Sequence, residues 1–211
     1  MKFSTATIAL LAAAVSAAPV DKRATGSTIS ELDEGGCRPY IFFHARGTGQ
    51  AGNVGQDPGP QAIDAVKAAL GDANVAGQGV PYPASLLGNL ASGGVPSKDA
   101  KAFAAQITAA TTQCPDSKIF LGGYSQGAAL IHRAVEQLSA AARAQIAAAV
   151  TWGDSQNKQD GGKIPTLDPS RTLIICRSGD LICQGTIFIT SAHQDYSPLA
   201  GQGAAFMVSK A

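Results

Sequence analysis

The sequence has little charge, few aromatic residues and no hydrophobic run long enough to span a membrane. Charged residues make up 15% and aromatic residues 6% of its 211 residues, and the formal net charge is +1. Nucleic-acid-binding domains carry clustered lysine and arginine, which this chain lacks, so we expect no nucleic-acid partner. An apolar content of 45% indicates a folded globular chain. No apolar stretch reaches the roughly 20 residues of a membrane span, so we expect no integral membrane association.

The first 23 residues are typical of a secretory leader. Lys2 precedes a short apolar run over residues 6–15, and residues 15–17 offer the small side chains that signal peptidase requires. We predict a signal peptide over residues 1–17, a propeptide over 18–23 that ends in the dibasic pair Lys22-Arg23, and one domain over 24–211. The alternative is that the signal peptide is cleaved near Ala17 and the short segment up to Arg23 stays attached to the protein. In both cases we expect an extracellular, secreted protein, and we expect it to be a monomer.

Only four cysteines are present, and secretion makes disulfides the natural reading of them. Four cysteines allow three pairings. Cys176 and Cys183 are close in sequence and flank a turn, which leaves Cys37 and Cys114 to each other.

Strand and helix patterns alternate along the chain. Apolar, β-branched or aromatic runs predict strands, and apolar residues at helical spacing predict helices. The predicted strands cover residues 39–44, 73–82, 118–122, 146–152 and 171–176, and the predicted helices cover 60–70, 97–114, 128–138 and 197–210. Such alternation favours a parallel sheet covered by helices on both faces. We therefore predict a single-domain α/β fold, a three-layer α/β/α sandwich around a mostly parallel five-stranded sheet.

Gly-Tyr-Ser-Gln-Gly, residues 123–127, lies between a predicted strand and a predicted helix. The pentapeptide alone is only suggestive, but the strand–turn–helix context is the one in which a serine is exposed for nucleophilic attack. The glycines permit a sharp turn because they have no Cβ. We predict that Ser125 is an acyl-transfer nucleophile and that the backbone N–H of Gln126 points toward the group it attacks.

A nucleophilic serine needs a base, and the chain has three histidines. His132 lies two helical turns beyond Ser125 and is interpreted as a surface or core residue, and His44 on the first strand as structural. His193, in a loop after the last strand, is the predicted base. Asp180 is the predicted carboxylate partner of His193, with Asp154 as the competitor. Asp195 is too close in sequence to His193 to bridge it easily.

The segment after the first strand, Ala45-Arg46-Gly47-Thr48, is expected to lie beside Ser125. Thr48 can donate both its N–H and its hydroxyl to an oxyanion, so Thr48 and Gln126 form the predicted oxyanion hole. We interpret Arg46 as a residue that holds this turn rather than as an anion clamp.

The motifs together resemble the fungal cutinase family. They are residues 45–48, residues 123–127, Gly179-Asp180-Leu181-Ile182-Cys183 and the following His193, and the resemblance covers essentially the whole mature chain. It implies a small α/β-hydrolase fold, a Ser125–His193–Asp180 triad, an oxyanion hole from Thr48 and Gln126, the disulfides Cys37–Cys114 and Cys176–Cys183, and no metal or cofactor. Thr48 is a departure, because many members carry serine there.

The leading hypothesis is a secreted serine esterase that hydrolyses cutin, other polyesters or short-chain acyl esters. Leu86, Leu87, Ile187 and Ile189 are the predicted contacts with a hydrophobic substrate, and Tyr124 is included in that site. Ordinary core packing is the alternative reading, above all for the alternating isoleucines. An acetylxylan esterase of the same broad family is the alternative enzyme, and it ranks second because its relatives usually carry more cysteines. A catalytically silent cell-wall or surface-binding protein is the alternative of another class.

Overall fold

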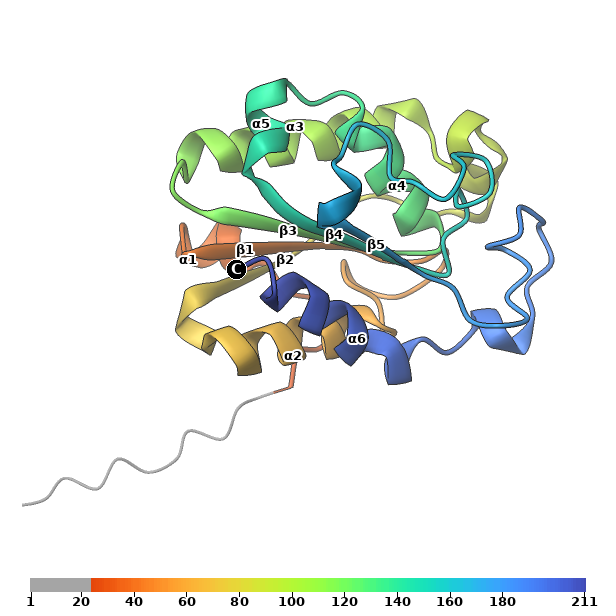
Figure 1. The fold of residues 1–211 in the computed structure, drawn as a ribbon, viewed down its shortest axis with the longest axis horizontal. Coiled ribbons are helices and arrows are strands. Elements are labelled where there is room, and N and C mark those ends of the chain that lie inside the picture. Colours follow the sequence, from red (N-terminus) through yellow and green to blue (C-terminus); the bar gives the residue numbers. More distant parts are fainter. Residues whose placement is uncertain (1–23) are drawn as a thin grey trace, which may run out of the picture.

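A computed structural model describes residues 24–211, whose fold is drawn in Figure 1. The predicted signal peptide and propeptide, residues 1–23, lie outside the described residues. None of the helices in residues 24–211 has the length and hydrophobicity needed to cross a bilayer.

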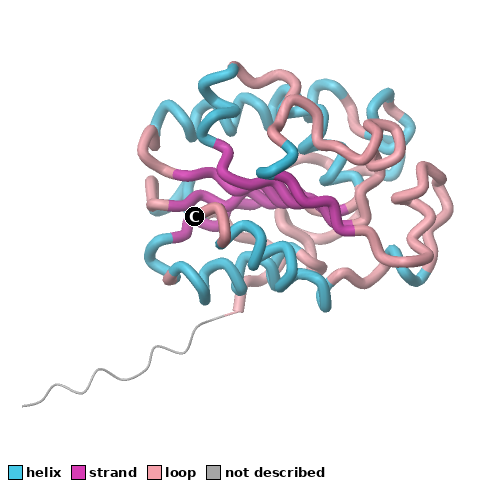
Figure 2. The backbone as a smooth tube through the Cα atoms, in the orientation of Figure 1, coloured by secondary structure: helices cyan, strands magenta, loops and turns pink. Residues whose placement is uncertain are grey.

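Five parallel strands form one sheet through the middle of the molecule (Figure 2). Their order across the sheet is β2-β1-β3-β4-β5. The strands are β1 (Tyr40–Ala45), β2 (Val75–Gly79), β3 (Lys118–Tyr124), β4 (Ile146–Trp152) and β5 (Thr172–Ile175). They are apolar along most of their length because helices cover both faces of the sheet. The predicted α/β sandwich with a five-stranded sheet is confirmed, and every pairing in the sheet is parallel.

The helices form a layer on each side of the sheet (Figure 1). One layer contains α3 (Ser97–Gln113), α4 (Gln126–Val135) and α5 (Ala140–Gln145), and the other contains α2 (Gly59–Leu70) and α6 (Ser197–Val208). Successive strand residues point to opposite faces, so Phe42 belongs to the core beside α2 and α6 whereas Phe43 packs in the core beside α3 and α4.

The N-terminal arm contains a short helix, α1 (Glu31–Gly35), in a stretch that the sequence marks only as polar and glycine-rich. Its one buried residue is Leu32. Glu31 accepts hydrogen bonds from Lys67 Nζ at 2.5 Å and from the Gly77 backbone N–H at 2.8 Å. Long-range bonds therefore hold this helix in place beside the edge strand β2.

Both disulfides form with the expected pairing, Cys37–Cys114 and Cys176–Cys183. The first joins residues 77 apart and so ties the N-terminal arm to the end of α3. On the loop-closure model it stabilises the fold by about 4.5 kcal/mol, against about 2.4 kcal/mol for the second, which closes seven residues. The short disulfide therefore acts mainly on its own loop, which carries Asp180.

The carboxyl ends of β1, β3, β4 and β5 meet at one edge of the sheet, as they do in any parallel sheet. Ala45 pairs with Gly123, and Trp152 pairs with both Tyr124 and Ile175. The loops that follow these strands carry most of the residues singled out by the sequence, so the fold assembles them into one site.

Candidate active site

Ser125 occupies a sharp turn between β3 and α4. Its backbone has φ 55° and ψ −117°, which is a strained conformation for any residue with a Cβ. A Cβ on Gly127 would lie 2.0 Å from the Ala45 carbonyl oxygen, and one on Gly123 would lie 2.6 Å from that of Gly127. Only glycine fits at these two positions, so the pentapeptide glycines allow the turn that presents Ser125 at the sheet edge.

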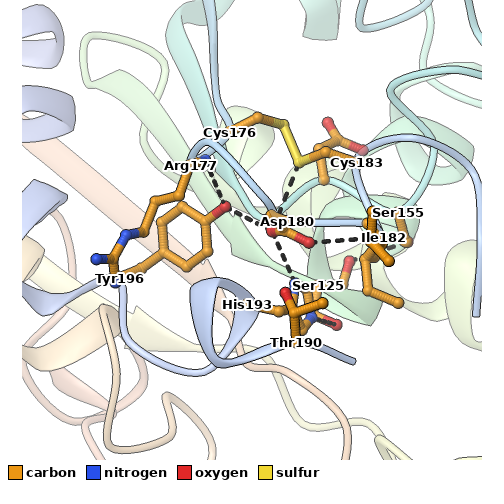
Figure 3. Close-up of polar contacts among 12 residues, drawn as sticks. Ser125, Ser155, Cys176, Arg177, Asp180, Ile182, Cys183, Thr190, His193 and Tyr196 are labelled. Carbon is orange, nitrogen blue, oxygen red and sulfur yellow. Dashed lines mark hydrogen bonds and ion pairs between the residues drawn. A yellow bond between two sulfur atoms is a disulfide. The ribbon is translucent and has the colours of Figure 1, made fainter. Parts of the chain in front are cut away.

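His193 lies between Ser125 and Asp180 in space (Figure 3). Its Nε2 is 3.0 Å from Ser125 Oγ, and its Nδ1 is 2.9 Å from Asp180 Oδ2. The imidazole is 3% exposed, so solvent does not compete for these bonds. The arrangement allows His193 to take the proton of Ser125 while its other nitrogen stays bonded to a carboxylate.

Asp180 is held by three donors from different segments. Besides His193, the Tyr196 hydroxyl donates to Oδ2 at 2.6 Å and the Ile182 N–H donates to Oδ1 at 2.9 Å. Burial alone would raise the pKa of Asp180, but the bonds from His193, Tyr196 and Ile182 hold it below its usual value. The side chain is therefore a buried carboxylate with a fixed orientation.

Two tyrosines hold Asp180 and His193 in place. The fully buried Tyr196 accepts the Arg177 N–H at 2.9 Å while it donates to Asp180. Tyr124, predicted to bind substrate, is 7% exposed; its hydroxyl donates to the His193 carbonyl oxygen and its ring stacks on the His193 imidazole. Its contact with substrate stays a prediction, and these bonds add a second role, which is to support the loop that carries His193.

Thr48 and Gln126 meet at a third residue, Asn89, which the sequence analysis did not single out. Asn89 Nδ2 donates to Thr48 Oγ1 at 3.0 Å, and Asn89 Oδ1 accepts from Gln126 Nε2 at 2.9 Å. Thr48 Oγ1 also lies 3.3 Å from Asn89 Oδ1, a longer contact that its proton must leave to donate to an oxyanion, while the shorter bond from Asn89 Nδ2 keeps the hydroxyl oriented. The Gln126 N–H lies in the first turn of α4, where backbone donors have no intrahelical partner.

Replacing Asn89 by alanine is expected to lower kcat by about 10- to 100-fold, somewhat less than the loss of a direct oxyanion donor. The substitution removes the partner that orients Thr48 Oγ1, while Ser125, His193 and Asp180 keep their bonds. The measurement is kcat on p-nitrophenyl butyrate, with Ser92→Ala in the same loop as the control. A kcat within twofold of the parent would show that Thr48 is oriented without Asn89.

The segments on either side of this site carry exposed apolar side chains. Six residues are 63–83% exposed, although they are large and apolar: Leu86, Leu87, Leu90, Ile187, Phe188 and Ile189. We call this group the apolar rim. Core packing was the alternative reading of the isoleucines, and it is wrong: the segment is not a strand, and the intervening Phe188 is exposed as well.

The competing candidates have other partners. His44 is fully buried, neither ring nitrogen has a hydrogen-bonding partner within residues 24–211, and burial lowers its pKa to about 3. It is therefore a neutral structural residue, as predicted. Asp154 is bonded to the buried His132 and not to His193. Asp195 is exposed and lies beside Arg177.

Arg46 holds the loop that carries Thr48. Its Nε donates to the Gln50 carbonyl at 2.9 Å, and its guanidinium lies 5.2 Å from the centre of the Tyr82 ring. Tyr82 in turn donates to the Arg46 carbonyl oxygen at 2.5 Å. The interpretation of Arg46 as a structural residue agrees with these contacts.

Comparison with known proteins agrees with this geometry. The cutinase family model matches residues 36–211. Cutinase CUT2 of Pyricularia oryzae is 53% identical over 204 residues, which cover 96% of this chain and 95% of that protein. Probable cutinase 3 of Aspergillus clavatus is 37% identical over the full length of both chains.

Solved structures extend the likeness to three dimensions. A Trichoderma reesei cutinase in complex with a phosphonate inhibitor is 36% identical, with a TM-score of 0.79 over 88% of this chain and 80% of that one. An acetylxylan esterase shares the fold at 23% identity, with a TM-score of 0.67 over 82% of this chain and 99% of that one. The chain described here belongs to the cutinase family, whose members are carboxylic ester hydrolases.

Proposed function

We propose that this protein is a secreted serine esterase that hydrolyses the ester bonds of cutin, related polyesters and short-chain acyl esters. The observation that carries the proposal is the connected chain of hydrogen bonds from Ser125 through His193 to Asp180. The predicted oxyanion donors support it, because Gln126 follows Ser125 directly and is linked to Thr48 through Asn89. The proposed catalytic residues are Ser125, His193 and Asp180, with Thr48 and Gln126 as the oxyanion hole.

The first half of the reaction forms an acyl-enzyme. Ser125 Oγ attacks the ester carbonyl carbon while His193 Nε2 takes the hydroxyl proton, and Asp180 stabilises the resulting imidazolium. The carbonyl oxygen becomes an oxyanion that accepts hydrogen bonds from Gln126 N–H and from Thr48 N–H and hydroxyl. The bond to the alcohol oxygen then breaks, and His193 donates its proton to the leaving alcohol.

The second half releases the acid. Water attacks the acyl carbonyl carbon, and His193 accepts one proton from it. The tetrahedral intermediate collapses, its bond to Ser125 breaks, and the proton on His193 returns to Ser125 Oγ. One ester and one water thus give one carboxylic acid and one alcohol, and the enzyme returns to its starting state.

An alkyl phosphonate tests the activated serine directly. It reacts with a nucleophilic serine that has an assembled base and oxyanion hole, and it forms a stable covalent adduct. We expect one adduct per molecule by intact mass, mapped to Ser125. A folded protein that forms no adduct would favour the alternative of a catalytically silent binding protein.

The apolar rim favours a hydrophobic, polymeric substrate. Exposed apolar patches of this kind mark binding surfaces. Full burial of a leucine or isoleucine side chain is worth about 1.5–3 kcal/mol, so partial burial of several against a polymer gives useful binding. An acetylated polysaccharide offers no comparable apolar surface, which ranks the acetylxylan esterase alternative second.

Polar substitutions on the rim are expected to separate polymer from soluble substrate. The variant combines Leu86→Ser, Leu87→Ser, Ile187→Thr and Ile189→Thr. We expect turnover of a polycaprolactone film to fall about tenfold or more as apolar contact is lost, while kcat on p-nitrophenyl acetate stays within about threefold. Unchanged film turnover in a folded variant would contradict the role of the rim. Faster release of acetate from acetylated xylan than of butyrate from butyryl esters would favour the acetylxylan esterase alternative.

We further propose a mature chain that begins at Ala24, after signal cleavage near Ala17 and processing behind Lys22-Arg23. In support, Thr25 donates its backbone N–H to both carboxylate oxygens of Asp64 at 3.1 Å, and its hydroxyl to one of them at 2.6 Å. The domain is thus tied to α2 from its second residue onward. N-terminal sequencing of the secreted protein would read Ala24 first.

We also propose that the protein is a monomer. Size-exclusion chromatography would then give the mass of a single chain.

A further inference from the structure

His132, a histidine that the proposed reaction does not use, lies in α4 seven residues after Ser125 and is fully buried. Its Nε2 is 2.9 Å from Asp154 Oδ2, and its Nδ1 is 2.7 Å from Asp160 Oδ2. Carboxylate oxygens only accept hydrogen bonds, so both ring nitrogens must donate. Only the imidazolium has two N–H groups. His132 is therefore a buried cation between two anions.

The surroundings of His132 fix both carboxylates. Asp154 also accepts bonds from the Thr151 hydroxyl at 2.7 Å and from the Gln156 N–H at 2.8 Å. Asp160 also pairs with the Arg133 guanidinium, which bonds to Glu136 at 3.2 Å. The charged groups around the ring are thus Asp154 after β4, Asp160 in the following loop, and Arg133 with Glu136 at the end of α4.

The electrostatics of the cluster agree with a charged ring. Burial alone would lower the pKa of His132, but the charges and hydrogen bonds of Asp154 and Asp160 raise it to about 9. The raised pKa means that the cluster stabilises the fold fully below the unfolded value of about 6.5, and that this contribution is lost as the pH rises through about 9.

Asp154 belongs to a segment, residues 152–155, that touches both Ser125 and His193. We call it the floor segment. The Trp152 carbonyl accepts the Ser125 N–H at 3.0 Å, and the Ser155 hydroxyl donates to the Ser125 carbonyl at 3.1 Å. Gly153, with φ 54°, lies so close to His193 that an added Cβ would come within 2.9 Å of Cε1.

We propose that His132 is a positioning residue whose positive charge holds Asp154, and through it the floor segment, at the place that sets the Ser125–His193 distance. The role rests on the proposed esterase function. Removing the cation leaves Asp154 as a fully buried carboxylate without a counter-charge, whereas Asp160 is half-buried and keeps Arg133. A buried carboxylate without a counter-charge moves or takes up a proton. Either response shifts the backbone of the floor segment, which contacts both Ser125 and His193.

Two substitutions test the role through different readouts. His132→Gln keeps one donor but no charge, and we expect kcat on p-nitrophenyl butyrate at pH 8 to fall about 10- to 100-fold with KM within twofold, as for a small displacement of reacting groups. Asp160→Asn removes one of the two anions, so we expect the reversible alkaline loss of activity to move down by about one pH unit. Glu136→Gln is the matched control, because it removes a charge near the end of α4 that does not contact His132. Its kcat is expected to stay within twofold of the parent.

The charge itself is measured without turnover. Nitrogen-15 NMR of the three histidine side chains, assigned with His132→Gln, should show both His132 nitrogens protonated at pH 7 and titrating near pH 9. The proposal is overturned if His132 is neutral at pH 7. It is also overturned if Asp160→Asn keeps the kcat of the parent and loses activity at the same alkaline pH. If His132→Gln does not fold, Asp160→Asn decides. A wild-type protein that forms no phosphonate adduct overturns the esterase function and the positioning role together, whereas normal turnover that neither substitution alters overturns the positioning role alone.

Discussion

Ser125→Ala is expected to lower kcat by about 10⁴- to 10⁶-fold, because it removes the only atom in the proposed site that forms a covalent bond with substrate. The expected residual rate comes from the proposed oxyanion donors and from substrate binding, which the substitution leaves in place. KM is expected to change little. Ser125 has a positive φ of 55°, and alanine tolerates this conformation no worse than serine, so the fold is expected to persist.

The measurement combines kinetics on p-nitrophenyl butyrate with phosphonate labelling. Ser178→Ala is the matched control, because Ser178 is an exposed serine in the disulfide loop that carries Asp180. We expect the control to label and to turn over within twofold of the parent, whereas Ser125→Ala forms no adduct. A Ser125→Ala variant that keeps more than a hundredth of the parental kcat would assign the nucleophile to another residue.

The sheet was predictable because its signal is local. β1, β3, β4 and β5 are each a short run of apolar residues bounded by turn residues, and the structure places them within about two residues of the predicted ends. The weak strand expected over residues 73–82 is the shorter β2, Val75–Gly79. α5 was missed, although Ser139 caps it with a bond from the Ala142 N–H, a signal that is present in the sequence.

The short helix α1 was missed for a different reason. Five residues with a single buried side chain carry almost no periodic pattern, and isolated helices of this length are unstable in water. Glu31 is held by Lys67 and by the Gly77 N–H, which lie 36 and 46 residues away. Only the folded chain brings these partners together, so sequence patterns could not reveal the helix.

The proposed catalytic residues were predictable because each follows a strand in a recognisable motif. Their supporting residues were not. Asn89 gains its role from Thr48 and Gln126, which lie 41 and 37 residues away. Tyr196 gains its role from Asp180, 16 residues earlier in the chain. Neither residue lies in a motif that announces a hydrogen bond, so their contribution is visible only once the loops have met.

Asp180→Asn is expected to lower kcat by about 10⁴-fold, the effect seen when a triad histidine loses its carboxylate. In the structure Asp180 Oδ2 accepts from His193 Nδ1 and from the Tyr196 hydroxyl, while Oδ1 accepts from the Ile182 N–H. An asparagine has only one acceptor oxygen, whereas the donors approach from two sides: His193 and Tyr196 on one side, and the Ile182 N–H on the other. If that oxygen stays with Ile182, the amide NH₂ faces His193 Nδ1 and favours the tautomer with its proton on Nε2, which cannot accept from Ser125.

The opposite orientation of the asparagine restores the tautomer but places an NH₂ against the buried Ile182 N–H. In either orientation the negative charge that stabilises the imidazolium is gone. Asp195→Asn is the matched control, because Asp195 lies two residues after His193 but is exposed beside Arg177; we expect it to stay within twofold. Kinetics are read on protein whose melting temperature shows it to be folded. A loss below tenfold in Asp180→Asn would mean that His193 keeps its tautomer and its charge stabilisation from other groups.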